Sequence, residues 1–185
     1  MAETTSTMLP LGTKAADFNL LDTRTEKFIS LPEIKSDIAT VIMFLCNHCP
    51  YVKHIQAKLL EVAKTYQAKG ISFVAISSND IEKYPADSPE NMRKEAKTHQ
   101  YTFPYLFDET QQAAKNYQAA CTPDFFIFDS DLKCVYRGRF DDATPGNHHP
   151  VTGKELCAAL DNVLSGNAVD DDQKPSLGCN IKWKE

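Results

Sequence analysis

The fold is decided by Ile38-Ala-Thr-Val-Ile-Met-Phe-Leu45, which is followed at once by Cys46-Asn-His-Cys49-Pro50. The first stretch is apolar at nearly every position and rich in β-branched residues, a pattern typical of a strand buried on both faces. After Pro50 the apolar residues recur at steps of three and four, at Val52, Ile55, Leu59, Val62 and Tyr66. That spacing predicts an amphipathic helix, which Lys69 and Gly70 end.

A second buried strand, Ile71-Ser-Phe-Val-Ala-Ile-Ser77, follows this helix. Strand, helix and strand form a βαβ unit, which predicts two parallel strands with a right-handed crossover. Around it the sequence predicts hairpins over 18–30 and 124–140 and a short helical turn over 31–34. It also predicts further helices over 88–99, 108–117 and 152–164. The fold class is therefore α/β, with a mixed central sheet and helices on both faces.

The three later helices begin with residues that favour a helix start. Ser88-Pro89 places proline at the first helical position, where its missing N–H costs nothing. Two further pairs resemble capping boxes, Asp108 with Gln111 and Thr152 with Glu155. We therefore expect helices to begin at these three places.

Length and composition predict one globular domain. The chain has 185 residues, of which 42% are hydrophobic and 24% are charged. Pro10 and Gly12 end a polar start, and the residues after 165 are polar and charged. We therefore expect a flexible leader over 1–12, a domain over 13–165 and a C-terminal extension over 166–185.

The charge pattern argues against two classes of partner. The net charge is −5 and no run of Lys and Arg occurs, so nucleic acid is not the expected partner. The longest apolar run, 38–45, is too short to span a bilayer, so no membrane association is expected. The first ten residues carry no secretory signal pattern, which predicts a cytoplasmic location.

Only two of the six cysteines, Cys46 and Cys49, form a close pair. They lie where the buried strand passes into the helix, and a helix start stabilises an anion such as a thiolate. If Pro50 is the first helical residue, Cys49 is the N-cap residue and its sulfur can reach the free N–H groups. We therefore expect Cys49 to be the nucleophile and Cys46 its disulfide partner, with the opposite order left open.

Several motifs resemble those of known redox proteins. Cys46-Asn-His-Cys49-Pro50 resembles the Cys-x-x-Cys site of thioredoxin-like disulfide oxidoreductases, and its Cys-Pro step resembles the peroxidatic site of peroxiredoxins. Cys121-Thr-Pro-Asp124 resembles the Thr-Pro loop of thioredoxin folds, where the proline is cis and faces the active cysteine. Nearly the whole chain resembles the peroxiredoxin-like branch of the AhpC/TSA redoxins, with Ser77-Ser-Asn-Asp80 and Gly178-Cys-Asn-Ile-Lys-Trp183 among the shared runs.

This resemblance implies a thioredoxin-like redoxin domain with an N-terminal hairpin, in which His48, Pro50, Thr122 and Pro123 support the active cysteines. Peroxiredoxins hold peroxide with a Thr and an Arg. Here Cys46 stands in the place of that Thr, and only location suggests Arg137 or Arg139 for the second role. The departure favours disulfide exchange over peroxide reduction.

The leading hypothesis is a thiol–disulfide oxidoreductase that uses a Cys46/Cys49 dithiol–disulfide couple. Its substrates would be protein or small-molecule disulfides or peroxides, its reductant a cellular thiol system, and it would need no cofactor. Three alternatives stay open: an antioxidant thiol peroxidase, a metal-binding or copper-delivery module of the same fold, and a non-catalytic redox sensor. The sequence leaves oligomeric assembly open.

The remaining cysteines and histidines carry weaker signals. Cys121 lies two residues before Pro123 and is a further redox thiol if it approaches the site. Cys179 lies in a tail that could fold back. Packing is the simpler explanation for Cys121 and Cys179, as for Cys134 and Cys157. His48 either tunes the thiolates or only spaces them. The adjacent His148 and His149 are weak evidence for metal, and we predict no metal site.

Overall fold

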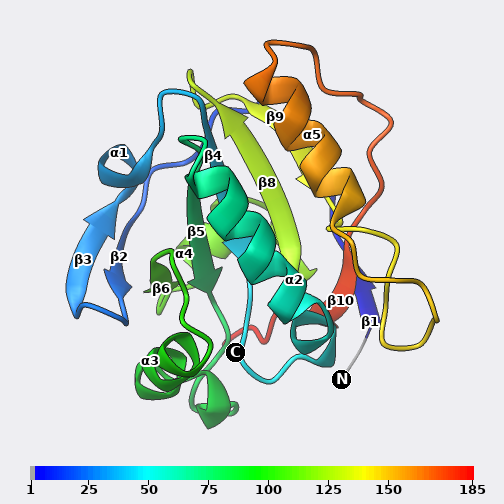
Figure 1. Cartoon of the computed structure of the whole chain (residues 1–185). Coiled ribbons are helices and arrows are strands. Elements are labelled where there is room, and N and C mark those ends of the chain that lie inside the picture. Colours follow the sequence, from blue (N-terminus) through cyan, green and yellow to red (C-terminus); the bar gives the residue numbers. More distant parts are fainter. Residues whose placement is uncertain (1–2) are drawn as a thin grey trace.

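The centre of the fold is one mixed sheet, seen in a computed structural model that describes residues 3–185 (Figure 1). Its seven strands are, in spatial order, β3 (Lys27–Ser30), β2 (Asn19–Asp22), β6 (Tyr105–Phe107), β5 (Ser72–Ser77), β4 (Ala39–Phe44), β8 (Asp124–Asp129) and β9 (Cys134–Gly138). Strand β4 runs parallel to β5 and antiparallel to β8. The predicted mixed sheet, its βαβ unit and both hairpins are confirmed.

Strand β4 supplies side chains to two cores because successive residues of a strand point to opposite faces. Val41 and Met43 lie in the core beneath α2 (Pro50–Gln67), α3 (Pro89–Thr98) and α5 (Lys154–Leu164). Ile42 and Phe44 lie in the other core, which α1 (Leu31–Ile34) and α4 (Gln112–Asn116) cover. Helices therefore flank both faces, as the unbroken apolar run of β4 predicts.

One of the three predicted helix starts is confirmed. The hydroxyl of Ser88 accepts the N–H of Asn91 at 3.4 Å and caps α3, with Pro89 as the first helical residue. At α4 the prediction is wrong. The helix begins after Gln111, which has a φ of 61°, and Asp108 instead accepts the N–H of Ala114 at 3.0 Å.

The capping box predicted at Thr152 and Glu155 is also wrong. Helix α5 begins after Gly153, whose φ of 68° lies in the left-handed region that glycine adopts freely. The carboxylate of Asp141 accepts the N–H groups of Thr152 and Gly153, each at 2.7 Å, and the hydroxyl of Thr152 accepts the N–H of Lys154 at 3.2 Å. Glu155 pairs with Arg139 instead of returning to the helix start.

A second sheet, which the sequence did not predict, joins the two ends of the described chain. Its three strands lie in the order β1 (Glu3–Thr5), β10 (Leu177–Asn180) and β7 (Cys121–Thr122), and both pairings are antiparallel. The expected flexible leader is therefore wrong for residues 3–12, since β1 is hydrogen-bonded and Leu9 is buried. Residues 1–2 of that leader lie outside the described residues. The division of the chain at 12 and 165 stays a prediction.

Candidate active site

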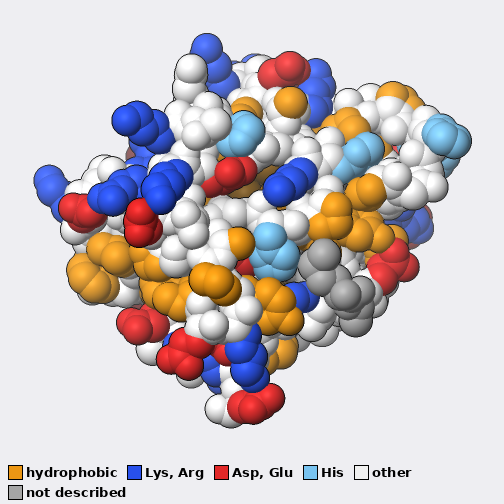
Figure 2. All heavy atoms as spheres, turned by 90° about the horizontal axis from the view of Figure 1, so that it is seen from below, with side chains coloured by type: hydrophobic (Ala, Val, Ile, Leu, Met, Phe, Trp, Pro, Cys, Tyr) orange, Lys and Arg blue, Asp and Glu red, His pale blue; other side chains and the backbone are white. Residues whose placement is uncertain are grey.

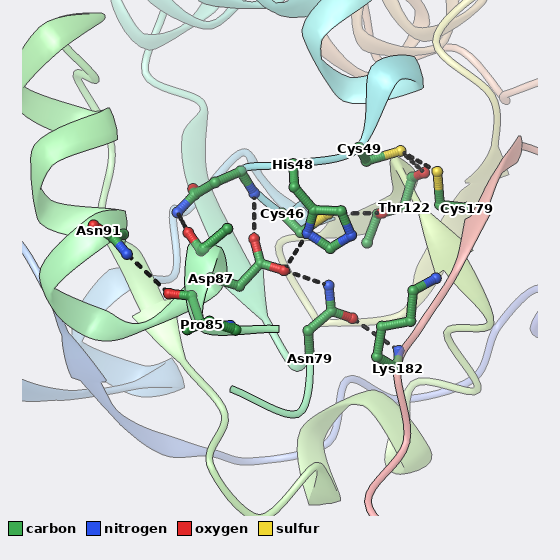
Figure 3. Close-up of polar contacts among 12 residues, drawn as sticks. Cys46, His48, Cys49, Asn79, Pro85, Asp87, Asn91, Thr122, Cys179 and Lys182 are labelled. Carbon is green, nitrogen blue, oxygen red and sulfur yellow. Dashed lines mark hydrogen bonds and ion pairs between the residues drawn. The ribbon is translucent and has the colours of Figure 1, made fainter. Parts of the chain in front are cut away.

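The site lies at the edge of the sheet where β4 and β5 end. Because these strands are parallel, the segments that follow them, Cys46–Cys49 and Ser78–Asp80, meet at the same edge. The start of α2 and the tail after β10 reach the same end of the molecule (Figure 1). Figure 3 shows the polar contacts made there.

Cys49 is the central residue of this site. It is the N-cap residue of α2, Pro50 is the first helical residue, and its side chain is fully buried. Its sulfur lies 3.2 Å from the carbonyl oxygen of Thr122 and 2.8 Å from the sulfur of Cys179 (Figure 3). The predicted placement of Cys49 at the helix start is confirmed, whereas its contact with Cys179 was not foreseen.

The neighbours of Cys49 stabilise its thiolate. The Cys46 thiol does most to lower the pKa of Cys49, against the opposing effect of burial, and the Cys179 thiol and the N–H groups of Val52 and Cys179 add to it. Together they bring that pKa to about 5. Both thiols lower this pKa more than the N–H of Val52 in the first turn of α2, so neighbouring thiols contribute more than the helix start that the sequence suggested. These neighbours therefore favour the thiolate form of Cys49.

Cys46 is a protonated partner to that thiolate. Its pKa is raised well above the ordinary thiol value, first by Cys49, then by burial and by the charge of Asp87. Its sulfur lies 3.3 Å from the hydroxyl oxygen of Thr122. The Thr122–Pro123 peptide bond is cis, as the resemblance implied, and it joins β7 to β8 directly beside the two cysteines.

A buried carboxylate, Asp87, holds the loop between the two cysteines in place. It lies in the short 3₁₀ helix η1 (Pro85–Asp87) and accepts the N–H of Asn47 at 2.8 Å, the side-chain N–H of Asn79 at 2.8 Å and a ring N–H of His48 at 2.6 Å. Burial opposes the charge of Asp87, but these donors outweigh it and keep its pKa below the usual value. The loop is thus fixed by a charge-assisted network.

His48 has a defined orientation in this network. Its Nδ1 atom faces Asp87, and its ring stacks on Tyr84 with centroids 5.5 Å apart and an interplanar angle of 10°. Its Nε2 atom is buried and has no hydrogen-bond partner among residues 3–185. His48 is therefore a held side chain, and not a free spacer.

The same corner brings three metal-ligating groups together. The sulfur of Cys46, a ring nitrogen of His48 and a carboxylate oxygen of Asp87 all lie within 4.8 Å of one another. Soft sulfur with imidazole suits copper or zinc. His148 and His149 belong to no such group within the described chain, and His149 instead pairs with Asp142 at 3.1 Å.

Three residues of the site were missed from the sequence. Asp87 follows no motif of its own. Asn79 stands in the shared run Ser77-Ser-Asn-Asp80, two residues after the second buried strand, which could have placed it at this edge. Asn79 also accepts the backbone N–H of Lys182 at 2.9 Å, and thereby joins the loop network to the tail (Figure 3). Cys179 lies in a polar tail with no local pattern that marks a strand.

The other residues singled out from the sequence lie outside this cluster. The sulfur of Cys121 is 3.8 Å from the carbonyl oxygen of Pro123, and burial raises its pKa. Arg137 binds the carbonyl oxygen of Leu9 and the side chain of Gln173, and Arg139 forms a salt bridge with Glu155. Cys134 is buried and Cys157 is half-buried.

Figure 2 views the molecule from the end that carries the site. Lys and Arg side chains are interspersed there with Asp and Glu, and hydrophobic side chains and histidines lie between them. The face does not form the continuous basic surface that binding to a phosphate backbone needs. Among residues 3–185, every helix is too short or too polar to cross a membrane.

The fold and the site define a thiol-based redox protein of the thioredoxin-like class. The AhpC/TSA family model matches residues 11–137, which is more than half of the chain. The protein belongs to the AhpC/TSA family, and this membership supports a general oxidoreductase role. A search of proteins with curated descriptions gives no match.

Solved structures show the same fold. An uncharacterised conserved protein from Geobacillus kaustophilus is 58% identical over 100% of this chain and 97% of its own, with a TM-score of 0.98. A hypothetical protein from Sinorhizobium meliloti is 46% identical over 98% of each chain, with a TM-score of 0.95. The thioredoxin domain of a thiol–disulfide oxidoreductase from Bacteroides vulgatus is 14% identical over 80% of this chain and 96% of its own, with a TM-score of 0.61. The last match concerns the fold alone.

Proposed function

We propose that the protein is a thiol–disulfide oxidoreductase in which Cys49 is the nucleophile and Cys46 its disulfide partner. The observation that carries this proposal is the position of Cys49 at the start of α2, beside the Cys46 thiol and the cis Thr122–Pro123 bond. A thiolate is the reactive form of cysteine, and these neighbours favour it. We further propose a cytoplasmic location, where a thiol system supplies electrons.

The reaction has two exchange steps. The Cys49 thiolate attacks one sulfur of a substrate disulfide, so that a mixed disulfide forms and one substrate thiolate leaves with a proton from solvent. Cys46 then loses its proton and attacks the Cys49 sulfur, which releases the second substrate thiol and closes a Cys46–Cys49 bond. Two electrons pass from protein to substrate, and a cellular dithiol returns them.

A groove beside the cis-proline offers a place for the substrate. Tyr51, Ile55, Pro123 and Leu177 are among the residues that line it, and Tyr51 lies two residues beyond Cys49. Polar side chains, among them Arg139, Asp141 and Asp142, also line the groove, and this mixed lining suits a peptide that carries a disulfide. Peroxide reduction is less well supported, because Arg137 and Arg139 are both engaged by other groups.

The test measures reduction of insulin disulfides and of hydrogen peroxide by the wild type, Cys46→Ser and Cys49→Ser. Cys49→Ser should lose disulfide reduction by at least about 100-fold, since serine is a far weaker nucleophile at neutral pH. Cys46→Ser should still form the mixed disulfide at Cys49 but should form no internal Cys46–Cys49 bond. Full activity of Cys49→Ser would contradict the assignment.

A metal-binding function is the second candidate, because Cys46, His48 and Asp87 lie close enough to share one ion. The same three proteins are incubated with Cu(I) or Zn(II), desalted and assayed for bound metal. Stoichiometric metal that is lost in Cys46→Ser and retained in Cys49→Ser would favour this function. Its absence from the wild type would exclude the function.

A further inference from the structure

A third sulfur shares the site with the predicted pair. Cys179 lies on β10, 130 residues along the chain from Cys49, and the two sulfur atoms are 2.8 Å apart. This is closer than two sulfur atoms that merely pack together, and both side chains are almost completely buried. Cys46, by comparison, directs its sulfur at the hydroxyl of Thr122.

The position of Cys179 is fixed by the fold. Strand β10 pairs with β7 so that Cys179 is opposite Thr122, the residue whose carbonyl oxygen contacts the Cys49 sulfur. Gly178 permits this approach, because a Cβ atom there would lie 2.0 Å from the carbonyl oxygen of Thr122. Beyond the strand, the N–H of Ile181 donates to the carbonyl oxygen of Ala120 at 3.0 Å.

The charges at the site suit an exchange between these two sulfurs. Burial first, and then the neighbouring Cys49 sulfur, raises the pKa of Cys179 to about 12, whereas that of Cys49 is about 5. Disulfide closure needs Cys49 to react first and Cys179 to lose its proton as it attacks, and the 2.8 Å between the two sulfurs leaves Cys179 in place for that attack.

We propose that Cys179 is a second resolving thiol, so that Cys49 closes a disulfide with β10 as well as with Cys46. This proposal rests on the proposed function, since it needs Cys49 to react first. In the mixed disulfide between Cys49 and a substrate, Cys179 gives up its proton to solvent and attacks the Cys49 sulfur. The Cys49–Cys179 bond forms, the bond to the substrate breaks, and the substrate leaves as a thiol.

The consequence is two disulfide states that share one sulfur. A Cys46 thiolate that attacks Cys49 in the Cys49–Cys179 state forms the Cys46–Cys49 bond and frees Cys179, with no net electron transfer. The tail is thus covalently attached to the start of α2 in one oxidised state and free in the other. A small dithiol that attacks either bond returns the protein to three thiols and is itself oxidised to its disulfide.

The experiment maps the disulfide in oxidised protein. Residues 155–182 form one tryptic peptide that contains both Cys157 and Cys179, because Lys174 precedes Pro175. All variants therefore carry Cys157→Ser, which also serves as the matched control. The parent and its Cys46→Ser and Cys179→Ser derivatives are oxidised with a small aromatic disulfide, alkylated in acid and analysed by mass spectrometry.

In the Cys46→Ser derivative, most of the oxidised protein should contain peptide 36–53 joined to peptide 155–182. In the Cys179→Ser derivative, this joined peptide should be absent and an internal Cys46–Cys49 bond should replace it. The proposal is overturned if the Cys46→Ser derivative forms the mixed disulfide at Cys49 and never the joined peptide. If Cys49 forms no mixed disulfide in any derivative, the proposed function has failed instead.

Discussion

The site is built from two segments, the loop 46–49 that carries Cys49 and the tail 177–183 that approaches its sulfur. They are held in place by different contacts. The loop 46–49 is fixed at both ends by regular structure, β4 before it and α2 after it. The tail 177–183 is fixed by pairing with distant segments, β7 and β1, and by Asn79. The loop is thus positioned by elements next to it in the sequence, whereas the tail is positioned by tertiary contacts with distant segments. Substitutions can therefore disturb one segment without the other.

The largest effect is expected from Asp87→Ala, which breaks the loop side. The buried carboxylate of Asp87 accepts hydrogen bonds from Asn47, His48 and Asn79. The alanine substitution leaves all three donors without their acceptor. We expect the free energy of unfolding to fall by about 3 kcal/mol, since buried donors without partners are costly. Urea unfolding measures it, with the exposed Asp171→Ala as the control. A loss as small as that of the control would show that the network does not hold the loop.

The matching change on the tail side is Gly178→Ala. The added Cβ would meet the backbone oxygen of Thr122, so β10 must move away from β7. We expect a loss of about 2 kcal/mol in unfolding free energy. The joined peptide of residues 36–53 and 155–182 should also form less readily. Gly146→Ala is the control, because a Cβ there has no atom within 4 Å. Unchanged stability in both glycine variants would show that β10 tolerates the displacement.

A smaller effect is expected from Asn79→Ala, which removes the residue that joins the two segments. The buried side chain of Asn79 donates a hydrogen bond to Asp87 and accepts one from the backbone N–H of Lys182. We expect a loss of about 1–2 kcal/mol, together with faster hydrogen exchange of the Lys182 amide. If that amide exchanges as in the wild type, the loop and the tail are not coupled through Asn79.

The smallest effect concerns the charge of Cys49. Cys46 lowers its pKa more than Cys179 does, so Cys46→Ala should raise the midpoint of thiolate absorbance from about 5 by about one pH unit. Cys179→Ala should raise it less. Because the folded pKa lies below the ordinary value of 9.0, Cys49 adds stability above pH 9 that is lost as pH falls through about 5. A larger shift in Cys179→Ala than in Cys46→Ala would show that Cys179 lowers the pKa of Cys49 more than Cys46 does.

The sequence predicted the parts of the fold whose signals are local. The apolar run of β4 and the three-and-four spacing of α2 each follow from burial within one element, and the Cys49-Pro50 step marks the helix start. The predicted cap at Thr152 failed because a distant group took over: the carboxylate of Asp141 binds the start of α5. At α4 Asp108 still accepts a helix N–H, from Ala114, but the helix begins three residues later than predicted. Local propensity does not reveal such partners.

The tail shows the same limit for the site. Strand β10 has four residues, Leu177–Asn180, and no alternation of apolar and polar side chains that would predict a strand. Its place depends on hydrogen bonds to β1 and β7, which are far away in the sequence. Cys46 and Cys49 could therefore be predicted as a pair, whereas the approach of Cys179 could only be seen in three dimensions.

The complete burial of Cys49 makes this sulfur a natural reporter of local opening. A thiol reagent reacts with this sulfur only while the segments that bury it are apart, so its rate gives the free energy of that opening. Thiol reagents of graded size would then measure how wide the opening is. The labelling rate of Cys49 would thus report how often the site opens locally.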